Sequence, residues 1–184
     1  SAARAAQRIY QSLKTQPLRC EMITLNKTVN DSTIRTPKEI DVKIKLKFAY
    51  DLLSSYRSQR ISSNRILQSY GEASAGILDE INNDDAKIVH LHWICNMLSI
   101  EDIGQINKQI VWSLHDMWPF SGSEHLTYDP DAYFYGHSSA TPLNDIAYKT
   151  WVKKVNLWKD KNFTIVAPSR WLAALAKKST LFRN

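Results

Sequence analysis

Two short apolar stretches of this sequence each end in side chains that could bind a ligand or move a proton. The first, Ile88–Trp93, carries His90 and His92, and the second, Ile110–Leu114, is followed at once by His115 and Asp116. A histidine can donate to a ligand hydroxyl or transfer a proton near neutral pH, and a carboxylate can accept a hydrogen bond from a hydroxyl. We therefore predict His115 and Asp116 as the catalytic pair.

The two stretches have the character of neighbouring strands in a parallel sheet. Each is a short run rich in Val and Ile, which is typical of strands buried on both faces. In open α/β sheets, ligands bind just beyond the carboxyl ends of such strands. The sequence therefore predicts a binding site built from His92–Asn96 and His115–His125.

The histidines leave a metal site open as an alternative. His90 and His92 are two residues apart, so on a strand they would point to the same face. Together with His115 and Asp116 they could serve a metal-dependent hydrolase, or they could simply pack within the sheet. Their spacing matches no known ligand signature, so we predict no metal site.

Further candidates for substrate binding lie around these strand ends and near the carboxyl terminus. Trp93 and Trp118 could stack on a ligand ring, with Pro119 and Phe120 beside Trp118. Ser169 and Arg170 open a helix after a third apolar run, where backbone N–H groups could bind an anion. The alternative role for Ser169 is that of an ordinary N-cap.

Strand-like and helix-like segments alternate along most of the chain. Strands are predicted at Arg19–Asn26, Ile88–Trp93, Lys108–Leu114 and Phe163–Ala167. Helices are predicted at Ser1–Lys14, Lys38–Arg57, within Ser62–Asn82 with an interruption at Gly71 and Gly76, from Ser99 to Asn107, at Ile146–Trp158 and at Trp171–Lys178. Lys27–Pro37 and Asp116–Asp145 read as loops. This alternation predicts an α/β fold, with a parallel sheet covered by helices on both faces.

Size and composition are those of one globular α/β domain. The chain has 184 residues, 43% of them hydrophobic, and a formal net charge of +6. Its basic character suits an anionic partner, and Lys43, Lys45 and Lys47 could meet a membrane surface or form a solvated face. Basic and aromatic residues do not interleave as in nucleic-acid-binding proteins, so we expect no nucleic acid partner. Two widely separated cysteines, Cys20 and Cys95, indicate a reducing cytoplasm.

Several motifs in sequence order resemble the amino-terminal half of family 4 glycosyltransferases, which have the GT-B fold and build bacterial surface polysaccharides. The segments are SAARAAQRIYQSLK, IVHLHW, LSIEDI, IVWSLHDMWPFSG and IVAPSRWLAALAKKSTLF. The most specific part is VWSLHDMWPFSG with APSRWL downstream. The resemblance covers most of the chain apart from about Lys27–Asp85.

The resemblance implies that residues 1–184 form a single Rossmann-like acceptor-side domain, cut at both ends. The opening strand and the donor-binding half of such enzymes would then lie outside this sequence. The whole protein would be a retaining enzyme that moves a sugar from a nucleotide-sugar donor to a lipid-linked or glycan acceptor, without a metal or other cofactor. It would work in the cytoplasm, with the inner membrane face as a possible contact.

The resemblance also implies roles for particular residues. His115 would face the sugar in the cleft, while Asp116 and the segment Trp118–Phe120 would shape the acceptor side. A non-catalytic carbohydrate-binding module that uses Trp118 and nearby aromatic side chains is a further alternative.

Overall fold

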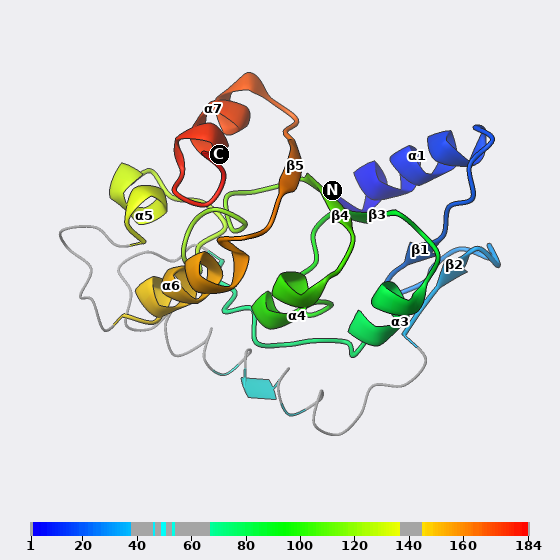
Figure 1. The fold of residues 1–184 in the computed structure, drawn as a ribbon, viewed down its shortest axis with the longest axis horizontal. Helices are drawn as coiled ribbons and strands as arrows, with labels where there is room; N and C mark the ends of the chain where they lie inside the picture. The colour runs from blue at the N-terminus through cyan, green and yellow to red at the C-terminus, as the bar shows by residue number, and fades with distance from the viewer. Residues whose placement is uncertain are drawn as a thin grey trace.

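A computed structural model describes residues 2–37, 67–136 and 145–183, together with Leu46, Ala49, Tyr50 and Leu53. The helix predicted over Lys38–Arg57, including Lys43, Lys45 and Lys47, lies almost entirely outside the described residues. The chain has a mixed α/β fold with two small parallel sheets, as Figure 1 shows. The predicted α/β class is therefore confirmed at this coarse level.

The larger sheet contains the strands that the sequence analysis placed at the site. β3 (Ile88–Leu91), β4 (Gln109–Ser113) and β5 (Phe163–Val166) run parallel, with β4 in the middle. Leu91 is in register with Trp112, which pairs in turn with Ile165. The carboxyl ends of the three strands consequently meet along one edge, as parallel pairing requires.

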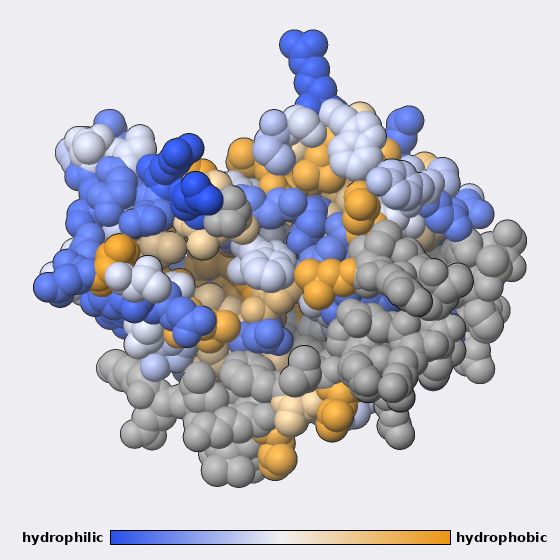
Figure 2. All heavy atoms as spheres, turned by 180° about the vertical axis from the view of Figure 1, so that it is seen from behind, coloured by the Kyte–Doolittle hydropathy of each residue, from blue (hydrophilic) through white to orange (hydrophobic). Residues whose placement is uncertain are grey.

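The residues of this sheet alternate between a buried face and a more open one. Leu91, Ile110 and Trp112 point into the main hydrophobic core. The helices α4 (Ile100–Gln105), α6 (Ile146–Trp158) and α7 (Arg170–Lys178) help to form this core. Ile88 and Val166 alternate to the opposite face, where they are 56% and 47% exposed. Figure 2 shows apolar side chains at the surface among polar ones on the rear side of the molecule. In the described part of the chain, the core therefore covers one face of the sheet more completely than the other.

The smaller sheet joins β1 (Met22–Ile23) to β2 (Ile34–Arg35) in parallel. β1 confirms the strand predicted over Arg19–Asn26 in a shorter form. β2 corrects the prediction that Lys27–Pro37 is only a loop. Two residues are too few to leave a periodic signal, and the strand is recognisable only through its pairing with β1.

Helices with strong local signals match their predictions closely. α1 (Ala2–Lys14), α4 (Ile100–Gln105), α6 (Ile146–Trp158) and α7 (Arg170–Lys178) all lie where the sequence placed them. Ser99 caps α4 through a complete capping box with Asp102, which satisfies backbone N–H groups that the helix itself cannot pair.

Two segments depart from the prediction. Within Ser62–Asn82, the described residues 67–77 are not helical, and α3 (Leu78–Asn83) forms after them and runs into the turn predicted at Asn83–Asp85. Gly71 and Gly76, where an interruption was predicted, adopt positive φ angles of 67° and 71°. The predicted loop Asp116–Asp145 contains a short helix, α5 (Pro130–Phe134), capped by Asp129.

Candidate functional site

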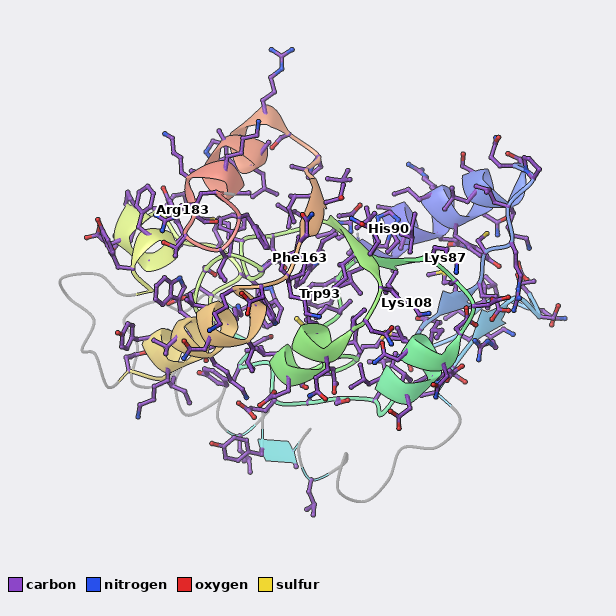
Figure 3. All side chains as sticks on the ribbon, viewed as in Figure 1. Lys87, His90, Trp93, Lys108, Phe163 and Arg183 are labelled. Atoms are coloured by element: carbon purple, nitrogen blue, oxygen red, sulfur yellow. The ribbon has the colours of Figure 1, made fainter. Side chains whose placement is uncertain are left out.

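The site is built where β3 and β4 end side by side. His92 and Trp93 follow β3, and His115 and Asp116 follow β4 after a single intervening leucine. The backbone N–H of Leu114 donates to the carbonyl of Val166, which ties the end of β4 to β5. In Figure 3 the labelled His90 and Trp93 lie in the central part of the molecule. The structure thus brings together His92, Trp93, His115 and Asp116, four of the residues predicted from the sequence.

Three histidines form a connected row across these strand ends. His90 Nε2 lies 2.9 Å from the hydroxyl of Ser113, and His92 Nδ1 lies 3.1 Å from His115 Nε2. The rings of His90 and His92 are 4.4 Å apart, and those of His92 and His115 are 5.4 Å apart. His90 and His92, which were predicted to share a strand face, therefore do lie together.

Burial keeps this histidine row uncharged near neutral pH. Desolvation, and to a smaller extent the neighbouring His90 and His115, lower the pKa of His92 to about 4. Burial also lowers the pKa of His90 and of His115, although Asp116 acts on His115 in the opposite direction. Each ring therefore offers one donor and one acceptor nitrogen to its neighbours.

Asp116 is held in place on both of its carboxylate oxygens. Oδ1 accepts a hydrogen bond from the backbone N–H of Trp118 at 3.1 Å, and Oδ2 lies 2.6 Å from Nδ1 of His125. Its side chain remains 20% exposed, so part of the carboxylate reaches the surface. Each oxygen keeps a second lone-pair direction with which it can accept from a ligand.

A small cavity opens between the two strand ends. Its volume is about 10 Å³, room for a single water molecule. It is lined by His92, Trp93, Ile94, Cys95, Trp112, Ser113, His115, Asp116, Trp118 and Pro119. The predicted His115 and Asp116 thus share one cavity with His92, Trp93, Trp118 and Pro119.

The aromatic candidates divide into one exposed ring and two buried ones. Trp93 is 52% exposed, whereas Trp118 is 2% and Phe120 0% exposed. Trp118 donates from Nε1 to the carbonyl of Ser69 at 2.7 Å and packs in the core beside Trp112. The structure therefore places Trp118 and Phe120 in the core, where protein covers the ring faces that were predicted to contact substrate.

Ser169 and Arg170 lie apart from the cavity lining, just beyond the end of β5. The hydroxyl of Ser169 accepts from the backbone N–H of Leu172 at 3.2 Å, so Ser169 is the N-cap of α7. Both residues are exposed. The N-cap alternative accounts fully for the geometry of Ser169.

The geometry gives the metal alternative no support. In the ranges that the structure describes, no group of three or more His, Cys, Asp or Glu side chains could hold a metal ion. His92 and His115 instead turn one nitrogen each toward the other.

Sequence reasoning missed a buried lysine that supports the site. Lys154 of α6 is fully buried, and its Nζ donates to the carbonyls of Trp118, Ser121 (3.3 Å) and Gly122 (2.7 Å). Nζ also lies 3.7 Å from the centre of the Trp118 ring, a cation–π contact. Burial lowers the pKa of Lys154 to about 7. The signal that could have identified this residue is its position on the inner face of α6, since a lysine is almost never fully buried without partners for its charge.

Comparison of the chain with protein-family models, with curated proteins and with solved structures gives no significant match. In the described part of the chain, no helix combines the length and apolar character needed to cross a membrane.

Proposed function

We propose that this chain is the acceptor-side domain of a retaining glycosyltransferase of the GT-B type. The whole enzyme would transfer a sugar from a nucleotide-sugar donor to a lipid-linked or glycan acceptor. The observation that carries the proposal is the pairing of a neutral His115 with an anchored Asp116 at the mouth of a cavity, beyond the ends of parallel strands. The motifs IVWSLHDMWPFSG and APSRWL support the same assignment.

In this proposal His115 and Asp116 act on hydroxyl groups. Transfer breaks the bond between the anomeric carbon and the donor diphosphate, forms a bond to the acceptor oxygen, and releases the proton of the acceptor hydroxyl. His92 engages Nε2 of His115, and among the described residues Nδ1 of His115 has no hydrogen-bond partner. That nitrogen is available to a sugar hydroxyl, and Asp116 can accept from a second one.

The cavity is so small that we infer a second domain, which would complete the binding site. A cavity for one water cannot enclose a sugar, so a ligand would lie across the rim, against the exposed ring of Trp93. The diphosphate and nucleotide would then need binding groups from another domain. We therefore expect the 184-residue chain alone to be inactive.

A nucleotide-release assay tests the proposal. The 184-residue chain and a longer parent protein with a second α/β domain are each incubated with a panel of nucleotide-sugars and glycan acceptors. The parent should release nucleotide, and the 184-residue chain should not. Release by the 184-residue chain alone would contradict the two-domain mechanism.

Variants of the parent link turnover to the site. His115→Ala should lower kcat by about 100-fold or more, the usual contribution of a general acid or base. Tyr128→Phe is the matched control, because Tyr128 is 83% exposed and lies outside the cavity lining. A parent that binds glycans through Trp93 without any turnover would instead favour the carbohydrate-binding module.

A further inference from the structure

Asp116 is held from behind by a chain of hydrogen bonds that leads away from the cavity. Nδ1 of His125 lies 2.6 Å from Oδ2 of Asp116, and Nε2 of the same ring lies 2.9 Å from the hydroxyl of Ser69. His125 is only 7% exposed. Its ring stacks on Trp118 and meets the edge of Trp93, with centroid distances of 6.5 and 5.9 Å. The imidazole is therefore fixed on both nitrogens and between two indole rings.

The backbone around His125 is fixed as firmly as its side chain. Residues 67–69 pair with residues 123–125: the N–H of Ser69 donates to Ser123 at 2.8 Å, and the N–H of His125 donates to Leu67 at 3.1 Å. The carbonyl of His125 accepts from the N–H of Met117 at 3.0 Å. These bonds fold the loop after β4 back onto the end of its own strand, and so bring His125 behind Asp116.

The order Asp116, His125, Ser69 has the connectivity of a hydrolytic triad, but its placement differs from one. Asp116 lines the cavity, whereas neither His125 nor Ser69 does. In a hydrolase the serine, not the carboxylate, faces the substrate. Two cavity-lining groups contact the nitrogens of His125: Oδ2 of Asp116 at 2.6 Å and Sγ of Cys95 at 4.0 Å. The short bond is the one to Asp116, so His125 acts on a ligand chiefly through this carboxylate.

We propose that His125 is the positioning residue that fixes the carboxylate of Asp116 toward the cavity, and that Ser69 in turn fixes His125. The proposal rests on the sugar-transferase function proposed above and adds the group that orients its acidic residue. A proton on Nδ1 of His125 satisfies both bonds: Nδ1–H donates to Asp116, and Nε2 accepts from the Ser69 hydroxyl.

Two substitutions separate positioning from packing. The amide nitrogen of Asn occupies the place of imidazole Nδ1, and that of Gln occupies the place of Nε2. His125→Asn therefore keeps a donor toward Asp116, and His125→Gln loses it. Both variants remove the ring between Trp93 and Trp118, so a role in packing alone would affect them equally.

The first measurement needs no substrate. The ¹⁵N chemical shifts of the wild-type imidazoles, assigned with the His125→Asn variant, report which ring nitrogen carries the proton. We expect Nδ1–H on His125, and we expect Asp116→Asn to shift that proton signal strongly. An Nε2–H tautomer, or a signal that Asp116→Asn leaves in place, overturns the proposal whether or not the protein is a glycosyltransferase.

The second measurement uses the parent enzyme with a nucleotide-sugar. His125→Gln should lower kcat by about 100-fold, the effect of displacing a reacting group by roughly 1 Å. The KM for the donor should stay within about threefold, and His125→Asn should restore most of kcat. Equal losses in the two variants overturn the proposal. A wild-type parent without turnover refutes the sugar-transferase function, and the imidazole tautomer then still decides whether His125 holds Asp116.

Discussion

Burial decides what the histidines in and just beyond β3 and β4 can do. Each of His90, His92 and His115 is partly removed from water, and each has a pKa below its ordinary value because desolvation disfavours the imidazolium. Neutral rings can lie this close without charge repulsion. Protonation of His92, the middle ring, would place a charge beside both His90 and His115.

Acid should therefore weaken the fold through His92. In the unfolded chain the pKa of this residue is near its ordinary value of about 6.5, whereas in the folded protein it is about 4. Between these values the unfolded state binds the proton first, so stability is lost as the pH falls from about 6.5 to about 4.

Urea unfolding at pH 7.0, 5.5 and 4.5 measures this loss. His92→Gln should show a shallower decline in the free energy of unfolding over the same range, although His90 and His115 still contribute in the same direction. Parallel declines in the two proteins would exclude His92 as a source of the acid sensitivity.

Lys154 is expected to be the costliest single side chain to remove near the site. Lys154→Met keeps the length of the chain but leaves the carbonyls of Trp118, Ser121 and Gly122 without their donor. We expect a loss of about 1–3 kcal/mol in the free energy of unfolding at pH 8, where the lowered pKa leaves the buried amine mostly uncharged and still able to donate.

Chemical denaturation measures this loss, and Lys149→Met on the exposed side of the same helix is the control. The control should change stability by less than about 0.5 kcal/mol. Equal effects of the two substitutions would contradict the role given to Lys154.

The sequence was informative about residues at strand ends and uninformative about residues that meet through loops. His92, Trp93, His115 and Asp116 follow apolar runs, so the parallel-sheet rule was sufficient to bring them together. His125 ends the predicted site segment His115–His125, but it comes nine residues after Asp116 and no periodicity brings the two side chains together. Its position depends on the pairing of residues 67–69 with residues 123–125, a contact between distant segments that no local pattern encodes.

At the level of elements, local capping signals were more reliable than apolar periodicity. The Ser99–Asp102 capping box located α4, because both reciprocal hydrogen bonds depend on residues three positions apart. Gly71, in contrast, lies in the helix-like stretch Ser62–Asn82, of which the described residues 67–77 are not helical. A Cβ at Gly71 would lie 2.6 Å from Cγ1 of Ile100, so this turn packs directly against the first residue of α4.

Loss of the α4 cap should be measurable. Ser99→Ala removes the acceptor for the N–H of Asp102 at a buried position, and we expect it to cost about 1 kcal/mol of stability. Thermal or chemical unfolding measures the difference. Ser12→Ala at an exposed position of α1 is the control and should be nearly neutral. If Ser99→Ala left the free energy of unfolding unchanged, water would have to replace the hydrogen bond of the cap.

At the level of the whole molecule, one aromatic cluster connects the sheet, the loop after β4, α6 and the segment that follows α7. Trp112, Trp118 and Trp158 lie within 6.5 Å of one another by ring centroids, and Phe163 and Phe182 join them. Since strand, helix and loop residues share this cluster, the described parts of the chain should unfold together.

Two optical signals test this cooperativity. Tryptophan fluorescence reports the cluster, and far-ultraviolet circular dichroism reports the helices and strands. We expect both signals to change at the same urea concentration. Trp171→Phe removes an exposed indole on α7, and in this variant both signals should still change at the same urea concentration. Separate transitions would show that the core around Trp118 and the rest of the fold are independent units.

The contrast between Trp93 and Trp118 restricts how this protein can acquire new ligand preferences. Substitutions at position 118 must preserve the lysine contact, the bond to Ser69 and the packing on Trp112, so selection for stability will remove most of them. Trp93 makes none of these three contacts, and its ring is 52% exposed. Directed evolution of ligand choice should therefore accumulate changes at residue 93 and leave residue 118 unaltered.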